Sequence, residues 1–509
     1  MNCRSIPRTM VRKLSFSVLG LLVLASCSQA AQLGQVHFDT SCKATVQPRF
    51  DEAVALLHSF EFKEAEEAFA EVEKRDPTCS IAAWGMAFAN TERLEAGASQ
   101  KVLASGWQQL QPWLSGKAGT QREQMYLDAV RAMYEKYNTV AADVRSKKYL
   151  VRMNTIRRKY PRDINASLFY ALGLLSAGKR REALSILLPI FHQYPDNPGA
   201  AHYIIHAGDT PELAMIALPA ARKYAQIAPD SPHALHMPSH IFNQLGLWQE
   251  SIHSNLASAQ VASEWIKNGH NETFDELHAL NNLEYGYLQL GLNDEARGII
   301  RQIDSVTAVP GGDPWAGKDA RIYYDVENHN WDDAVTLGAP AGSPFQENFD
   351  VYWLHAIAAA RLGRIQAAET ALRDFKKSSQ EWTSGSGHDF AEGILHLALL
   401  QADAWVTFAR GDRSKATGEL QRAMRFERDH PMYYADILPR PSSEMLGDMF
   451  LQMGKPANAL RAYQMSLKIA PNRFDSLRGA KTSAAQAGRE LLSQEYAAKI
   501  ASLSAIRTH

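Results

Sequence analysis

The chain has 509 residues, 46% of them hydrophobic, so it can bury a large core but is too long for one compact domain. Its 54 Lys and Arg residues nearly balance its 55 Asp and Glu residues, which leaves no basic field of the kind that drives sequence-independent binding to nucleic acid. We therefore expect several domains or an array of repeats, with no nucleic-acid partner.

Residues 1–27 differ in composition from the rest of the chain. Basic residues at positions 4, 8, 12 and 13 precede an uncharged run from Leu14 to Ser26, which is typical of a secretory signal peptide. The run is shorter than the roughly 20 apolar residues that a membrane-spanning helix needs. It ends in Leu-Ala-Ser-Cys and resembles a bacterial lipobox, with Cys27 as the lipidated first residue of the mature chain. This predicts an exported, lipid-anchored protein of the bacterial cell envelope that faces the periplasm or the cell surface.

Two alternatives remain open for this leader. A plain signal peptide would be cut after Ser28-Gln29-Ala30, and translation could begin at Met10, which would shorten the leader without changing the mature chain. No later segment is long and apolar enough to span a bilayer, so we expect contact with the membrane only through the N-terminal lipid.

Internal repetition is the strongest structural signal in the chain. The clearest unit spans residues 444–471 and resembles the tetratricopeptide repeat in the positions of its packing residues, Leu446, Gly447, Phe450, Ala459, Tyr463 and Pro471. The spacing of the last three recurs twice further towards the N-terminus, at Ala65, Phe69 and Pro77 and at Ala183, Leu187 and Pro195.

The spacing between repeats agrees with this resemblance. A Pro-Asp-x-Pro motif begins at Pro195 and again at Pro229. This step equals the repeat length of the tetratricopeptide family, about 34 residues. Strand patterns are absent. We predict an all-α fold, a right-handed superhelix of stacked antiparallel helix pairs, as in tetratricopeptide-repeat solenoids.

Loops rich in Gly, Ser and Pro at 308–314 and 379–387, and a further loop at 429–441, suggest the domain boundaries. We expect six segments: a signal peptide with lipobox (1–27), a tether (28–44), N-terminal repeats (45–163), central repeats (164–307), divergent helical repeats (308–428), and a loop with the last repeat and closing helices (429–509).

Two cysteines, Cys42 and Cys79, remain once Cys3 is removed with the leader and Cys27 is modified. They lie in a compartment that permits disulfides. In the repeat arrangement, Cys42 precedes the first helix and Cys79 begins the third, so the starts of two roughly parallel helices are neighbours. We expect a Cys42–Cys79 disulfide, with two free buried thiols as the alternative.

Six of the 17 histidines form an unusual arrangement in the central repeats. His202 with His206, and His236 with His240, are His-x-x-x-His pairs, which place two imidazoles side by side on one helix face and so can chelate a metal. The two pairs are one repeat length apart and therefore occupy equivalent positions in adjacent repeats. His233 extends the second pair along the same face.

Further polar residues extend this face. Asp209 continues the first stripe, and the next repeat contributes His278, Asn281 and Tyr285. Pro238 falls inside the helix that carries the second pair, where it should bend the chain.

The last repeat suggests where these side chains point. Its positions equivalent to the histidine pairs hold Glu444 and Asp448, which are not packing positions of the repeat. We therefore expect the histidines, like these two carboxylates, to face the open groove of the solenoid. With metal–nitrogen distances of about 2.0–2.1 Å, imidazoles from adjacent helices could converge on one ion or hold two ions close together.

Imidazole ligands with some carboxylate suit a transition metal, and we favour zinc or copper, with iron as a further candidate. If a coordination position stays open, a bound water could be activated, and Asp209, Asp275 and Glu276 are the candidate bases. Without a metal, neutral imidazoles could line a pH-sensitive peptide groove or a carbohydrate or anion site.

The run from His233 to Phe242, together with residues 200–206, resembles a group of long bacterial tetratricopeptide proteins. We associate no activity with that group, so the function must be inferred from the site. The first hypothesis is a metal-binding solenoid of the cell envelope, and whether it is also an enzyme stays open. The alternative is a metal-free scaffold that binds a protein or peptide partner in its concave groove.

Overall fold

The computed structural model describes residues 31–505 apart from 92–98, 115–118, 271–272, 308–313, 339–343, 346–347, 384–388 and 431–437. The predicted leader, with Met10 and Cys27, lies outside the described residues. So do most of the predicted loop at 308–314 and parts of the other two loops. Residues 379–383, which we expected in a loop, instead belong to a helix.

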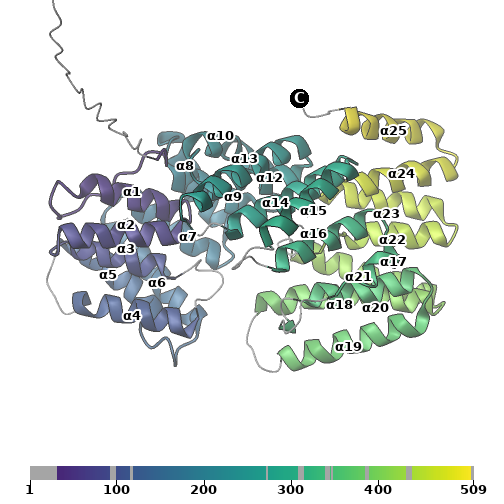
Figure 1. Ribbon diagram of the computed structural model, residues 1–509, viewed down its shortest axis with the longest axis horizontal. Coiled ribbons are helices and arrows are strands. Elements are labelled where there is room, and N and C mark those ends of the chain that lie inside the picture. Colours follow the sequence, from purple (N-terminus) through teal and green to yellow (C-terminus); the bar gives the residue numbers. More distant parts are fainter. Residues whose placement is uncertain are drawn as a thin grey trace, which may run out of the picture. The chain divides into compact units, whose positions relative to one another are not determined.

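Helices joined by short turns make up the described residues, which contain no strands, and consecutive helices pack in pairs (Figure 1). The N-terminal repeats contain α1 (Gln47–His58), α2 (Phe62–Arg75), α3 (Ser80–Ala89), α4 (Gln100–Leu114), α5 (Gln121–Tyr134) and α6 (Ala142–Lys159). The central repeats contain α7 (Ile164–Ser176), α8 (Arg180–Gln193), α9 (Pro198–Gly208), α10 (Ala214–Ile227), α11 (Pro232–His236), α12 (Pro238–Leu245), α13 (Trp248–Lys267), α14 (Thr273–Gln289) and α15 (Asn293–Thr307).

The C-terminal part of the chain continues in the same way. Its helices are α16 (Pro314–Glu327), α17 (Trp331–Ala334), α18 (Phe349–Arg361), α19 (Ile365–Thr383), α20 (Asp389–Ala409), α21 (Arg413–Asp429), α22 (Ser442–Gln452), α23 (Pro456–Ile469), α24 (Phe474–Gln486) and α25 (Glu490–Ala505). None of the helices in the described part of the chain is long and apolar enough to cross a membrane.

The last repeat shows why these sequences form close helix pairs. Tyr463 of α23 is 2% exposed, and its ring lies against Gly447 of α22 and Gly479 of α24. A Cβ atom at either glycine would lie within 2.7 Å of that ring, so the absence of a side chain allows the close approach. Ala459 is fully buried beside them. The predicted all-α fold of tetratricopeptide-type helix pairs is confirmed.

The repeat spacing is visible in how two helices of the central repeats begin. Asn197 caps α9 and Ser231 caps α11, and each side chain accepts a hydrogen bond of 3.0 Å from the backbone N–H three residues later. Each cap is followed by a proline at the first helical position, where no N–H donor is needed. The two helices therefore begin at equivalent positions of adjacent repeats, so that equivalent residues lie on equivalent faces.

Pro238 divides the second of these helices. Because proline has no N–H to donate, the helical hydrogen bonds stop at Met237, and α11 and α12 follow each other as separate helices. The break lies between His236 and His240.

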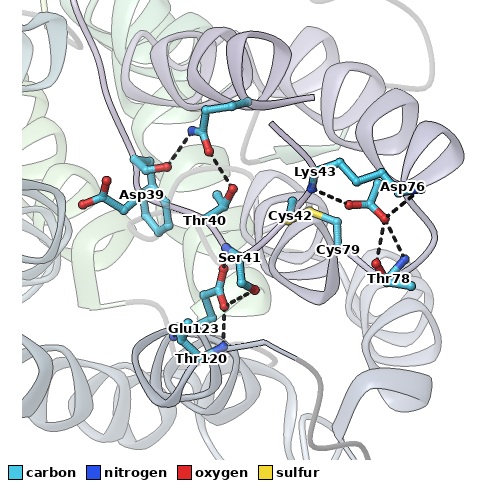
Figure 2. Close-up of a disulfide and its surroundings, with 12 residues drawn as sticks. Asp39, Thr40, Ser41, Cys42, Lys43, Asp76, Thr78, Cys79, Thr120 and Glu123 are labelled. Carbon is cyan, nitrogen blue, oxygen red and sulfur yellow. Dashed lines mark hydrogen bonds and ion pairs between the residues drawn. A yellow bond between two sulfur atoms is a disulfide. The ribbon is translucent and has the colours of Figure 1, made fainter. Parts of the chain in front are cut away.

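A disulfide joins Cys42 to Cys79, 37 positions later, at the N-terminal end of the repeats (Figure 2). Backbone N–H groups on both sides of Cys42 are also held, since Ser41 donates to the Glu123 carboxylate at 2.7 Å and Lys43 donates to Asp76 at 2.8 Å. The disulfide therefore belongs to a wider set of contacts that fix residues 41–43 to α3 and α5.

The segment that precedes Cys42, which we expected to be part of a tether, packs along the repeats. Leu33 and Phe38 are buried, at 4% and 0% exposed. The Gln35 N–H donates to the Asp196 carbonyl oxygen at 2.8 Å, and Asn165 donates to the His37 carbonyl oxygen at 2.8 Å. Residues 32–44 are thus part of the folded body.

The turn before α13 contacts the turn before α24, although the two are far apart in the sequence. The Trp248 indole donates to the Asn472 carbonyl oxygen at 3.0 Å, and the Asn472 amide donates to the Gly246 carbonyl oxygen at 3.2 Å. Gly246 has a φ of 64°, and a Cβ atom there would lie 2.0 Å from the Pro471 carbonyl oxygen. The central and C-terminal repeats therefore meet directly.

Candidate metal centre

The six predicted histidines lie in two groups of three. The first group, which we call the first triad, consists of His202 and His206 of α9 and His233 of α11. The Nε2 atom of His202 lies 3.0 Å from Nε2 of His206 and 3.2 Å from Nε2 of His233. Two nitrogens on one tetrahedral zinc ion would lie about 3.4 Å apart. The three nitrogens therefore converge at a spacing that suits a shared ion.

A hydrogen bond fixes the orientation of the central imidazole of the first triad. Nδ1 of His202 donates to the backbone carbonyl oxygen of His58 at 2.6 Å. Because the carbonyl can only accept, the proton of a neutral His202 ring lies on Nδ1, and Nε2 is left with its lone pair facing the other two histidines. This is the outer-shell arrangement that orients histidine ligands in metal sites.

Phe60 covers the first triad. Its ring centroid lies 4.4 Å from that of His202, 5.3 Å from His206 and 5.7 Å from His233. Phe60 lies in the turn between α1 and α2 with a φ of 60°, a left-handed conformation that is rare for a bulky residue. The turn thus presents an apolar ring to all three imidazoles.

The second triad consists of His236 of α11, His240 of α12 and His278 of α14. Nε2 of His236 lies 2.9 Å from Nε2 of His240, and the ring centroid of His278 lies 4.5 Å from that of His236. In each triad, the ligand atoms all lie within 4.8 Å of one another. The two triads are adjacent, because the ring centroids of His233 and His236 lie 6.4 Å apart.

Two histidines of the second triad also have outer-shell partners. Nδ1 of His236 donates to Oδ1 of Asn255 at 2.7 Å, and Nδ1 of His240 donates to the Asp209 carboxylate at 3.0 Å. The Asn255 amide group donates to the Ser251 carbonyl oxygen at 2.9 Å, which keeps Oδ1 turned towards His236. Gln244 holds the other Asp209 oxygen at 3.0 Å. Both Nε2 lone pairs are therefore directed into the triad.

Three groups at the triads have shifted pKa values. Burial, together with the neighbouring imidazoles, lowers the pKa of His236 well below its ordinary value, so this ring is in the neutral form that binds metals. Burial acts to raise the pKa of Asp209. The charge of His240 and the hydrogen bonds from His240 and Gln244 outweigh burial, so the pKa of Asp209 is lowered. Glu61, beside His233, has a pKa raised to about 8 by burial and by the negative charge of Asp275.

The expectation that the histidines face an open groove is wrong for three of them. His202, His233 and His236 are 0%, 6% and 2% exposed. Besides the cover from Phe60, the ring of His202 stacks on Tyr224 of α10 at 5.2 Å. The triads therefore lie largely inside the folded body.

The three candidate bases have different surroundings. Asp209 binds His240, and Oδ1 of Asp275 lies 3.8 Å from Nδ1 of His233. Glu276 interacts with Ser263 and Lys267 of α13, and burial raises its pKa. Two of the three carboxylates thus lie beside the histidines.

Asn281 and Tyr285 share a pocket with His278. The pocket has a volume of about 90 Å³ and reaches from the second triad to Arg473 of the turn before α24. Its wall also includes Asn243 and Gln244 of α12. These polar residues from three regions of the chain therefore surround one small space beside the triad.

We expected Glu444 and Asp448 to line the same groove as the histidines, and this expectation is wrong. Glu444 is fully buried, accepts hydrogen bonds from Arg440 at 2.8 Å and from Arg473 at 2.7 Å, and so belongs to a buried ion-pair cluster. Asp448 accepts from Arg361 at 2.7 Å and from Tyr463 at 2.6 Å. The two carboxylates thus form ion pairs with arginines that stabilise the fold.

Sequence reasoning missed four residues that support the triads: His58, Phe60, Glu61 and Asn255. The first three lie where α1 meets α2, far from His202 in the sequence, and none falls at the repeat spacing. Asn255 lies on α13, the helix that follows the second histidine pair. The only sequence signal for Asn255 was its position as a polar residue among small and apolar residues of that helix.

No protein-family model matches the chain, and no curated protein matches it. The crystal structure of the APC/C hetero-tetramer Cut9-Hcn1 is similar at a TM-score of 0.35 and 13% sequence identity, with 91% of this chain and 88% of that chain covered. The assignment of the fold to the tetratricopeptide type rests on the helix pairs and the repeat register described above.

Proposed function

We propose that this protein is a metal-binding solenoid of the bacterial cell envelope that holds two transition-metal ions in adjacent sites. The observation that carries the proposal is the convergence of three imidazoles in each triad, with all ligand atoms of a triad within 4.8 Å of one another. An ion placed between three converging imidazole nitrogens would bind all of them at once.

The ligands limit the choice of metal. Three neutral imidazoles per ion suit zinc or copper, and iron is the further candidate. Carboxylates contribute indirectly. The Asp209 carboxylate accepts a hydrogen bond from Nδ1 of His240, which raises the basicity of that ligand. A water or another ligand would complete a four-coordinate site.

Elemental analysis of the purified protein, residues 28–509 without an affinity His tag, tests the proposal. We expect about two equivalents of metal in the wild type, and one equivalent in each of two variants in which all three histidines of one triad are changed to Ala. His192→Ala with His253→Ala, at two exposed histidines outside the triads, is the matched control and should leave the metal content unchanged. Wild-type protein that stays free of zinc, copper and iron after reconstitution would refute the proposal.

The location in the envelope is a separate part of the proposal. It rests on the predicted lipobox and is supported by the Cys42–Cys79 disulfide, since disulfides persist in oxidising compartments. Mass spectrometry of the N-terminal peptide from the native membrane should find a diacylglyceryl group on Cys27, and Cys27→Ser should release the protein. An unmodified N-terminus at Ala31 would instead show plain secretion.

A metal-free scaffold for a protein or peptide partner is the second candidate function. It is favoured by a largely apolar pocket of about 430 Å³, whose lining includes Pro211, Met424 and Met465. Met465 is 48% exposed, and apolar surface left open to solvent beside a pocket can mark an interaction site. A partner that binds with equal affinity before and after chelation, and to both triad variants, would favour this function over the first.

A further inference from the structure

The two triads differ in what lies next to them. The Phe60 ring contacts all three imidazoles of the first triad. In the second triad, His278 forms part of the wall of the 90 Å³ pocket. An ion in the second triad would therefore border a polar space, whereas an ion in the first would border an aromatic ring.

A residue of the pocket wall carries a buried acceptor that has no donor among the described residues. Gln244 is 5% exposed, and its amide nitrogen donates to the Asp209 carboxylate at 3.0 Å, which fixes the orientation of the amide. Oε1 of Gln244 must then be an acceptor, and it has no hydrogen-bond partner among the described residues. A buried polar atom without a partner costs about 1–3 kcal/mol. A ligand that donates an O–H or N–H group would remove this cost.

Asn281 adds a second acceptor to the same wall. Its Oδ1 atom is buried and also lacks a hydrogen-bond partner within the described part of the chain. Gln244 and Asn281 come from α12 and α14, the two helices that also carry His240 and His278. The two acceptors thus lie on the same helices as two ligands of the second triad, in the wall of the pocket that His278 also lines.

The charged residues of the pocket wall are already paired. Arg473 donates to Glu444 at 2.7 Å and also contacts Glu327, so its charge is compensated. Asp319 lies 3.1 Å from the Lys318 ammonium group. Lys318 also pairs with Asp350 at 2.7 Å. The described residues of the wall therefore offer no uncompensated positive charge to an anionic ligand, and they suit a molecule that is neutral when free and carries hydrogen-bond donors.

We propose that an ion held by His236, His240 and His278 keeps open coordination positions facing this pocket, and that the pocket binds a small chelating ligand, neutral when free, that donates a hydrogen bond to Asn281, with Gln244 as a further acceptor. Hydroxamic acids and vicinal diols belong to this chemical class. The inference rests on the metal binding proposed above and assigns the two triads different roles: the first holds its ion under Phe60, and the second presents its ion to a ligand. When a hydroxamic acid binds, its O–H proton leaves to the solvent, both oxygens of the resulting hydroxamate bind the ion, and its N–H group remains as the hydrogen-bond donor.

Cobalt(II) and acetohydroxamic acid test the inference. A variant with His202, His206 and His233 changed to Ala retains only the second triad, and the reverse variant retains only the first. Each is loaded with cobalt and titrated with acetohydroxamic acid, while the visible d–d spectrum is recorded. We expect a saturable spectral change in the variant that keeps the second triad, and an unchanged spectrum in the other.

Asn281→Ala, in the background that keeps the second triad, tests the role of the pocket. We expect unchanged cobalt stoichiometry and an affinity for acetohydroxamic acid that is about tenfold weaker, because one buried hydrogen bond is lost. Asn293→Ala, at an exposed asparagine of α15, is the matched control and should keep the full affinity.

The outcomes separate the two proposals. Failure of both triad variants and of the wild type to bind cobalt, zinc or copper would refute metal binding itself. Cobalt bound stoichiometrically in the second triad, with a spectrum that acetohydroxamic acid leaves unchanged, would overturn only the open positions. A spectral change with equal affinity in Asn281→Ala would overturn the assignment of the ligand to this pocket.

Discussion

Nδ1 of His236 donates to Oδ1 of Asn255 at 2.7 Å, and both side chains are at most 2% exposed. Such outer-shell bonds fix the orientation of a ligand, and their loss typically weakens metal affinity about 10- to 100-fold. We expect Asn255→Leu to weaken binding in the second triad by about this factor, as measured by competition with a chromophoric chelator. Asn255→Asp, which keeps the acceptor, should retain most of the affinity.

The first triad serves as an internal reference in this experiment, because the histidine that Asn255 orients belongs to the second. The binding step of the first triad should keep its affinity in Asn255→Leu, so only one of the two steps should weaken. Equal weakening of both steps would point to a general loss of structure instead.

Gly447→Ala should destabilise the last repeat. A Cβ atom at this position would lie 2.7 Å from the ring of the buried Tyr463, and such overpacking typically costs about 1–3 kcal/mol. Gly418→Ala in α21 is the matched control, because no described atom lies within 4 Å of the added group. This control should gain up to about 1 kcal/mol from helix propensity. Urea denaturation followed by circular dichroism distinguishes the two, and a stable Gly447→Ala would contradict the packing described here.

Arg473→Met should be strongly destabilising. Arg473 is 2% exposed and bonds to Glu444, Glu327 and Tyr285. Its removal takes the bonded arginine from the buried Glu327 and leaves Glu444 with Arg440 as its remaining arginine partner, and breaking a buried ion pair typically costs about 3–5 kcal/mol. In the exposed pair of Arg181 and Glu212, the side chains are 71% and 73% exposed, so Arg181→Met should change stability by less than about 1 kcal/mol. Similar melting temperatures for the two variants would contradict this difference.

Glu427 makes stability depend on pH. Burial raises its pKa to about 7, from an ordinary value of 4.5. The folded state therefore keeps a proton that the unfolded state loses, and this carboxyl group destabilises the protein increasingly as the pH rises from about 4.5 to 7. The effect is at most about 3 kcal/mol. Glu427→Gln, which mimics the neutral acid, should melt at a higher temperature than the wild type at pH 8. At pH 4.5 the two should melt together, and a constant difference at all pH values would contradict the assignment.

Reduction of the Cys42–Cys79 disulfide should loosen the N-terminal end of the repeats. The bridge closes a loop of 37 positions, and breaking it typically costs about 2–4 kcal/mol. Hydrogen exchange at residues 32–44 should accelerate in Cys42→Ser with Cys79→Ser, while exchange in α22 and α23 stays unchanged. Unchanged protection of residues 32–44 would show that their contacts with Asp76 and Glu123 suffice.

The repeat fold could be predicted from the sequence because its determinants recur at a fixed spacing. Asn197 and Ser231 cap their helices in the same way, one repeat length apart, so the phase of the two histidine pairs followed from the sequence alone. The grouping of the six histidines into two triads did not follow, because it depends on how His233 and His278 approach from neighbouring helices.

The burial of the histidines could not be predicted, because residues outside the repeat spacing cause it. Phe60 reaches the first triad from a turn near the start of the repeats, and only its left-handed backbone conformation brings the ring into place. The same holds for Glu444, whose partners Arg440 and Arg473 lie in connecting segments. The repeat spacing predicts which helix face a side chain lies on, whereas residues in turns and connecting segments determine what covers that face.

The contact between Gly246 and Pro471 joins two parts of the site that are made at different times. Residues 202–278 supply every histidine of both triads, so the ligands are complete once the central repeats have formed. The pocket needs Pro439, Pro441 and Arg473 as well, which follow much later in the chain. Because chains of this size fold progressively from the N-terminus, the six imidazoles of the proposed metal sites come together before the rest of the pocket wall is in place.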